Sequence, residues 1–170
     1  MEKLQWNSFT KKIYIHTSSK KLYELWGTSA GITSWFLKHA EYTSSDKKVR
    51  NPTEHIQKGD TYTWSWHNWD GIENGRVLEA NGKDYIEITF ETSKVSISLE
   101  EKGNVTIIVL TQFDIPEDDD SKLRIHYGCS NGWTFWLANL KAFIEHGILL
   151  NETEIDLREN ELAGYQFVNM

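Results

Sequence analysis

Hydrophobic residues recur at three- and four-residue steps near the end of the chain, between Gly132 and Gly147. The large apolar side chains of this stretch would share one face of a helix: Trp133, Trp136, Leu137, Leu140, Phe143 and Ile144. We expect Ser130 or Asn131 to cap its start and Gly147 to follow its last turn. The pattern predicts a helix of roughly 24 Å, long enough to lie across a β-sheet.

Residues 59–113 follow a period of two instead. Tyr62, Trp64 and Trp66 alternate with polar residues, as in a strand buried on one face. Gly75 marks a bulge or a close approach between neighbouring groups. Further strands are predicted at 72–80, 85–91, 95–99 and 105–113, with turns at 81–82 and 102–104. The last strand is nearly continuous apolar sequence, which predicts burial on both faces or a central place in the sheet.

Shorter elements are expected on both sides of this region. A strand at 9–17 precedes two short helices, at 20–26 and from Ser29 through Phe36, and a strand at 39–45 follows. Residues 46–58 have the composition of a polar, partly basic loop, and 121–129 form a short helix leading into the long one. This order predicts an α+β fold in which a twisted antiparallel sheet of about six or seven strands wraps a long helix.

The length of 170 residues suits a single domain, which we place at 1–150. We expect the extension at 151–170 to pack on this domain or on a second subunit, because it is too apolar for a disordered end. A homodimer through this tail is therefore predicted. The apolar residues concerned are Ile155, Leu157, Leu162, Tyr165, Phe167 and Val168.

The composition excludes several classes of partner. The formal net charge of −7 disfavours nucleic acid and anionic membrane surfaces, which need a basic protein face. Cys129 is the single cysteine, so no internal disulfide forms. We find neither a secretory signal nor an apolar run long enough to cross a membrane, and we expect a cytoplasmic protein without membrane insertion. No sequence feature calls for a cofactor.

Several segments, taken together and in order, resemble one superfamily. They are residues 22–26 (LYELW), Ile32 with Trp35-Phe36, Gly59-Asp60 with Tyr62 and Trp64, Gly75-Arg76-Val77, and the helix from Gly132 to Gly147. Over residues 8–147 the chain resembles the helix-grip fold of the START-like, Bet v 1-like (SRPBCC) superfamily, and looks like homologues of the activator of the heat-shock-chaperone ATPase. The resemblance implies a groove between sheet and long helix, often open to small apolar ligands, and it carries over no catalytic residue.

We therefore predict a non-catalytic protein that binds a small hydrophobic or amphipathic molecule between sheet and helix. The predicted ligand-binding residues are Trp35, Trp64, Trp66, Phe90, Trp133, Trp136, Leu137 and Leu140. The same rings could instead fill the space completely. Two alternatives remain open: a chaperone-regulator-like interaction protein with a filled core, and a cyclase- or hydrolase-type enzyme acting on an aromatic substrate.

Other candidate chemistry is weak. His67, Asp70 and Glu73 have metal-binding side chains, but their spacing suits a helix and the segment has the pattern of a hairpin, so we expect no metal site. Cys129 lies three residues after His126 without an orienting group or an oxyanion site, which favours a structural thiol.

Carboxylates offer the remaining candidates. The acidic run at 117–120 lacks calcium-loop spacing and suits a solvated loop before a helix. Strand parity places Glu87 and Glu91 toward solvent and leaves Glu73 undecided. A carboxylate in an apolar groove would be the general acid or base that an enzyme of this fold needs.

Overall fold

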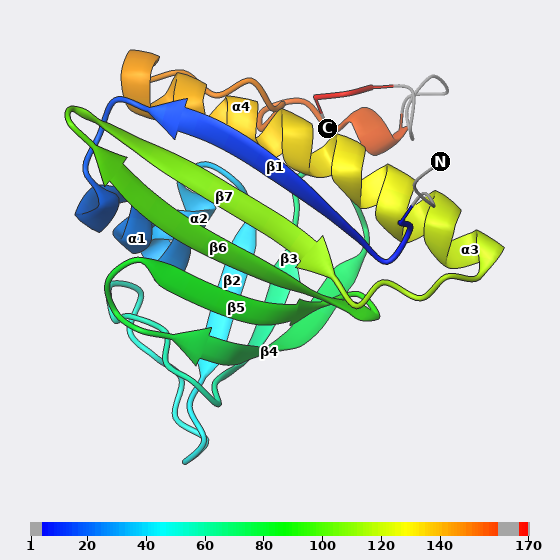
Figure 1. Cartoon of the computed structure of the whole chain (residues 1–170), viewed down its shortest axis with the longest axis horizontal. Coiled ribbons are helices and arrows are strands. Elements are labelled where there is room, and N and C mark those ends of the chain that lie inside the picture. The colour runs from blue at the N-terminus through cyan, green and yellow to red at the C-terminus, as the bar shows by residue number, and fades with distance from the viewer. Residues whose placement is uncertain (1–4, 160–166, 170) are drawn as a thin grey trace.

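A curved antiparallel sheet and a long helix lying across it make up the fold (Figure 1). This computed structural model describes residues 5–159 and 167–169. The seven strands in these residues pair in the order β1-β7-β6-β5-β4-β3-β2, and every pairing is antiparallel. The strands are β1 Ser8–Ile15, β2 His39–Thr43, β3 Thr61–Ser65, β4 Ile72–Ala80, β5 Tyr85–Phe90, β6 Ser93–Lys102 and β7 Val105–Phe113.

Two short helices form the corner between β1 and β2, as predicted: α1 Ser19–Gly27 and α2 Ser29–Thr33. The Ser18 hydroxyl caps α1 by accepting from the Lys21 N–H at 3.2 Å. Helix α2 ends at Thr33, earlier than the predicted Phe36. Trp35 and Phe36 follow in a tight turn that directs both rings into the core.

The long helix starts earlier than the sequence pattern indicated. Three consecutive segments form it: α3 Asp119–Ser121, the π-helical η1 Lys122–Cys129 and α4 Ser130–His146. The predicted cap at Ser130 or Asn131 is wrong, because the Ser130 N–H already donates to the His126 and Tyr127 carbonyls within the helix. The cap is Asp118, whose carboxylate accepts from the Ser121 N–H at 3.0 Å.

The end of the long helix is as predicted. Gly147 follows the last turn of α4 with φ of 70°, a left-handed conformation that favours glycine.

Strand alternation decides which side chains enter the core. In β3 the aromatic side chains Tyr62 and Trp64 are buried, whereas Thr61 is exposed and Thr63 and Ser65 are half-buried. In β7, alternate residues such as Ile108 and Leu110 are fully buried, whereas Ile107 and Val109 are half-buried on the outer face. Burial of β7 on both faces was therefore wrong, although the strand does lie inside the sheet, between β1 and β6.

The sheet bends where β4 changes partner. The first half of β4 pairs with β3, from Ile72 to Arg76, and its second half pairs with β5, from Val77 to Ala80, with an irregularity between Val77 and Glu79. Side-chain groups of Thr89 and Glu73 bridge the opening between the separated strands: the Thr89 hydroxyl accepts from the Arg76 N–H at 2.9 Å, and the Glu73 carboxylate from the Glu91 N–H at 2.9 Å. This bend curls the sheet around the long helix (Figure 1).

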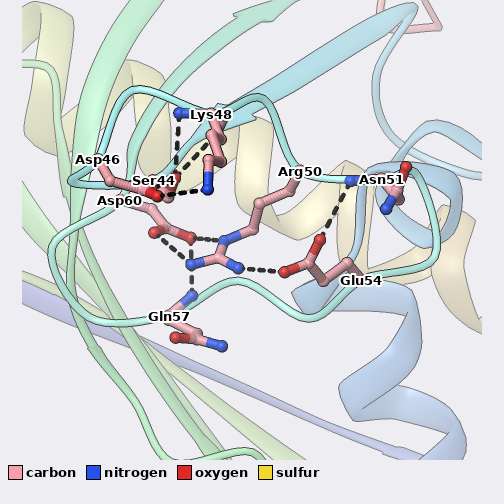
Figure 2. A network of polar contacts seen from close by, with 8 residues as sticks. All are labelled: Ser44, Asp46, Lys48, Arg50, Asn51, Glu54, Gln57 and Asp60. Carbon is pink, nitrogen blue, oxygen red and sulfur yellow. Dashed lines mark hydrogen bonds and ion pairs between the residues drawn. The ribbon is translucent and has the colours of Figure 1, made fainter.

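A buried ion pair organises the predicted polar loop between β2 and β3 (Figure 2). The Arg50 guanidinium donates to both oxygens of Asp60, which is 1% exposed, and also to Glu54. Asp60 accepts a further bond from the Gln57 N–H at 2.8 Å. The loop is thus held by charge-assisted hydrogen bonds that the sequence did not reveal.

The chain after α4 returns along the domain. Asn139, fully buried on α4, accepts from the Leu150 N–H at 2.6 Å and donates to the Asn151 side chain at 3.1 Å. Asn68 likewise donates to the Glu152 carbonyl and accepts from the Leu157 N–H, next to the short helix η2 Leu157–Glu159. Residues 148–159 therefore contact the domain, whereas the predicted tail residues Leu162 and Tyr165 lie outside the described residues.

Candidate functional site

The structure brings all six predicted ligand-binding aromatic residues together between the sheet and α4. We call the full cluster the aromatic seam: Trp26, Trp35, Phe36, Trp64, Trp66, Phe90, Trp133 and Trp136. Its walls come from three places: the inner face of β3 and β5, the corner around α1 and α2, and the inner face of α4. The other two predicted residues, Leu137 and Leu140, are buried in the same hydrophobic core.

Phe36 is the centre of the seam, although sequence reasoning did not select it. Its ring centroid lies 5.0 Å from that of Trp136, 5.4 Å from Trp133 and 5.7 Å from Trp66. The Phe90 ring lies between the helix wall and the sheet wall, 5.5 Å from Trp133 of α4 and 6.3 Å from Trp64 of β3. These separations suit offset and edge-to-face contacts, which favour a continuous aromatic cluster.

The seam runs from the interior to the surface. Trp26 and Trp35 are 3% and 1% exposed, whereas Trp136 is half-buried. At the surface end, the Trp66 ring lies 4.9 Å from that of Trp69, which is 45% exposed. A planar molecule that approaches from this end therefore meets aromatic rings from the first contact inward.

The rings contact one another directly, so the seam is closed in this structure. Two hollows stand out in the described part of the chain, and both lie elsewhere. One of about 400 Å³ lies beside Gly75 and Thr89, where β4 and β5 separate. The other, of about 470 Å³, lies between α1, α2 and the 53–55 segment, with Phe143 on its wall. Entry of a ligand into the seam thus requires at least one ring to move.

The indole N–H groups of three buried tryptophans in the seam have specific hydrogen-bond acceptors. Trp35 Nε1 donates to the Leu25 carbonyl at 3.1 Å, and Trp64 Nε1 to the Tyr42 hydroxyl at 3.2 Å. Trp133 Nε1 donates to Gln112 Oε1 at 2.9 Å. Each of these bonds fixes a ring in place, because a buried N–H is costly to leave without an acceptor.

Gln112 is a buried polar residue that the sequence pattern did not single out. It is fully buried on β7, and its amide nitrogen donates to the Ser93 hydroxyl at 2.8 Å. Ser93 in turn donates to the Phe90 carbonyl at 2.8 Å. This network links α4 to β7, β6 and β5 beneath the seam, and both polar ends of the Gln112 carboxamide are hydrogen-bonded.

Glu73 is a strand carboxylate with the parity of the inner face. It lies opposite Trp64 across the β3–β4 ladder, with the same strand parity as the inward-facing Val77. Burial raises the pKa of the Glu73 carboxyl, and the hydrogen bond from the Glu91 N–H opposes this shift. Glu87 accepts from the Tyr85 hydroxyl at 2.6 Å, and Glu91 is exposed at the turn after β5.

Cys129 and His126 do not form a nucleophile–base pair. His126 Nε2 lies 3.2 Å from the Ser8 carbonyl oxygen, and its ring packs edge-on against Trp6 and Phe9. Burial raises the pKa of the Cys129 thiol to about 11, so the thiol is protonated at neutral pH. Its chemistry is therefore that of a small apolar side chain.

The His67, Asp70 and Glu73 side chains do not converge on one site. Asp70 pairs with Arg158 from the returning tail at 2.6 Å, and burial together with nearby Lys38 lowers the pKa of His67. Within residues 5–159 and 167–169, no group of three or more His, Cys, Asp or Glu side chains is arranged to hold a metal ion.

The fold and the seam define a helix-grip domain of the Bet v 1-like class, and comparison with known families identifies the branch. Residues 16–145 match the family described as activator of Hsp90 ATPase homolog 1-like protein. The chain belongs to this family, as the sequence resemblance indicated. No curated protein matched the chain significantly.

Solved structures with the same fold come from several bacteria. A Staphylococcus saprophyticus protein is 18% identical, with a TM-score of 0.67 over 86% of this chain and 97% of that one. A Mesorhizobium loti protein is 15% identical, with a TM-score of 0.66 over 84% and 99%. The Aha1 dimer from Colwellia psychrerythraea is 18% identical, with a TM-score of 0.64 over 82% and 97%. At these identities the likeness establishes the fold alone.

Proposed function

We propose that this protein binds a small apolar or amphipathic molecule in the aromatic seam and catalyses no reaction on it. The observation that carries the proposal is the unbroken run of aromatic rings from exposed Trp69 to fully buried Trp35. Such a run offers a planar ligand contact on both sides. Burying its apolar surface would contribute about 25 cal/mol per Å², less the cost of ordering the complex.

Ligand entry has a defined place in this proposal. Trp136 is half-buried on α4 and touches Phe36 and Phe135 at centroid distances of 5.0 and 5.1 Å. The indole N–H groups of Trp35, Trp64 and Trp133 each donate a hydrogen bond. The Trp136 indole makes none within the described residues. Turning Trp136 outward therefore breaks no hydrogen bond and exposes a ring that is already half-buried. We assign Trp136 as the side chain that moves to admit the ligand.

The test combines co-purification with titration. Native mass spectrometry of the recombinant protein should detect a bound small molecule, and N-phenyl-1-naphthylamine should bind with one-to-one stoichiometry by calorimetry. Trp136→Ala should weaken this binding about tenfold, because one wall of the seam is lost. Trp6→Ala, at a ring 37% exposed and remote from the seam contacts, serves as the matched control. If no small molecule co-purifies and the probe does not bind stoichiometrically, the proposal is overturned.

A second candidate function is favoured by the close packing of the rings. If the seam never opens, the working surface is external, and the family description suggests regulation of a chaperone ATPase. The measurement is the ATPase rate of an Hsp90-type chaperone over a range of concentrations of this protein. A saturable change in rate supports this candidate, and an unchanged rate at large excess removes it.

We further propose a homodimer formed through the returning tail. Its outer side exposes the apolar residues Ile148, Leu149, Leu150 and Ile155 at 40–63%, and a structural neighbour is itself described as a dimer. Light scattering should give twice the monomer mass, and Leu149→Ser with Ile155→Ser should return the monomer mass. A monomer at all concentrations would contradict this proposal.

The helices of the described residues include none long and apolar enough to cross a membrane, and we propose a cytoplasmic location.

A further inference from the structure

One polar atom stands out inside the aromatic seam. Trp26 is 3% exposed, and its Nε1 is the single buried side-chain nitrogen or oxygen without a hydrogen-bond partner in the described residues. The other fully buried indoles of the seam, on Trp35, Trp64 and Trp133, each donate to an acceptor at 2.9–3.2 Å. Three fully buried indoles of the seam therefore have a hydrogen-bond acceptor, and the indole of Trp26 has none.

The surroundings of Trp26 offer no ordinary substitute for that bond. Its ring packs against Trp35, Phe36 and Trp133, at centroid distances of 4.8, 6.5 and 6.1 Å. A buried water molecule needs two to four polar partners, and a group of aromatic rings does not supply them. A buried donor left in this state destabilises the free protein, so its presence calls for an explanation.

We propose that Trp26 Nε1 is the hydrogen-bond donor that recognises the ligand, and that the seam selects flat apolar molecules carrying one neutral acceptor oxygen, such as an aromatic ketone. This inference rests on the proposed ligand binding and adds its chemical class. The acceptor is neutral because every residue of the seam is aromatic, so a carboxylate placed there would lose its hydration without gaining a cation. Recognition by one buried donor favours ligands that complete the bond.

Matched ligands test this directly. 2-Acetylnaphthalene and 2-isopropenylnaphthalene have nearly the same planar shape, but only the first carries an acceptor oxygen. Calorimetry should show that the ketone binds about tenfold more tightly to the native protein. In a ¹⁵N-labelled sample, the indole N–H signal of Trp26, assigned from its loss in Trp26→Phe, should shift downfield with the ketone alone.

Two variants separate the N–H group from the ring. Trp26→Phe should reduce the preference for the ketone to less than twofold. Trp35→Phe removes the same ring volume together with a bonded N–H, so it should weaken both ligands alike and keep the preference. The melting temperature of Trp26→Phe should exceed that of Trp35→Phe. Should Trp26→Phe prove unstable, 3-benzothienylalanine at position 26 keeps the bicyclic shape without the N–H.

The outcomes distinguish this inference from the function it rests on. If neither naphthalene binds the native protein, ligand binding in the seam fails and the inference fails with it. If both bind equally, and Trp26→Phe alters neither affinity, the proposed function stands and the role of Trp26 is overturned. Loss of the ketone preference in Trp26→Phe, with its retention in Trp35→Phe, supports the inference.

Discussion

The ring of Tyr62 lies against Gly75 on the neighbouring strand. The two residues pair across the β3–β4 ladder, and a Cβ atom on Gly75 would fall 2.3 Å from the Tyr62 Cζ atom. Because Gly75 has no side chain, the Tyr62 hydroxyl reaches past β4 and donates to the Thr89 carbonyl on β5 at 2.5 Å. This contact holds β5 to β3 where β4 has left its ladder with β5.

Adding a methyl group at this contact tests its importance. Gly75→Ala should lower the free energy of unfolding by about 1–3 kcal/mol, because Tyr62 must move and its bond to Thr89 is strained. Gly132→Ala is the control, since a Cβ there meets no atom within 4 Å and alanine favours a helix. Urea unfolding measures both, and equal stability of the two variants would contradict the close-packing argument.

The Arg50–Asp60 pair should be the dominant contribution of its loop to stability. Asp60→Asn removes the buried charge and leaves the Arg50 guanidinium with only the more exposed Glu54 as its counterion, so the free energy of unfolding should fall by about 3–5 kcal/mol. Asp46→Asn, in an exposed pair with Lys48, should change stability by less than about 1 kcal/mol. Thermal unfolding by circular dichroism compares the two, and similar melting temperatures would argue against this role of the pair.

Glu145 should make the protein sensitive to acid. Bonds from Lys141 and from the His16 backbone and ring hold the pKa of Glu145 at about 2, below its ordinary value of 4.5. The folded pKa is lowered, so the stability from this group is present above pH 4.5 and is lost as pH falls toward 2. In urea unfolding between pH 2.5 and 6, Glu145→Gln should therefore show a shallower pH dependence than the native protein. An unchanged slope would mean that the α4–β1 contact does not depend on this charge.

The pH dependence of stability that comes from Glu73 should have the opposite sign to that from Glu145. Its pKa is raised by burial, so the charged carboxylate is disfavoured in the folded state and folding gains stability as pH falls through the raised pKa. Glu73→Gln keeps an oxygen that accepts from the Glu91 N–H and removes the charge. We expect Glu73→Gln to melt at a slightly higher temperature than the native protein at pH 8, because solvent screens part of the charge penalty, and to show no gain near pH 4. A lower melting temperature at both pH values would contradict this account.

Local patterns revealed most of the elements but not the contacts between them. The period-two segment around Trp64 and the helical steps from Trp133 to Ile144 are amphipathic, and an amphipathic face is a property of consecutive residues. The start of the long helix was misplaced because Ser130 and Asn131 resemble caps in isolation. Only the helical backbone already present at Cys129 removes the need for a cap there.

The missed residues depend on partners far away in the chain. Asn139 acts through Trp35 and Leu150, and Gln112 through Ser93 and Trp133. Strand parity with Ile108 and Leu110 does place Gln112 on the inner face of β7, but the neighbouring sequence of neither amide identifies its hydrogen-bond partners. The central place of Phe36 was equally hidden, because it arises from the turn after α2, which brings the ring against Trp133 and Trp136 of α4.

The sequence by itself determined the antiparallel sheet, the long amphipathic helix and the inward aromatic face, since these follow from side-chain periodicity within single elements. Only the tertiary structure decided that the aromatic rings close on one another and that Trp26, unlike Trp35, keeps an open donor. Ring packing and hydrogen-bond pairing depend on distances between residues that are remote in sequence, and those distances are set by the way the sheet bends around α4.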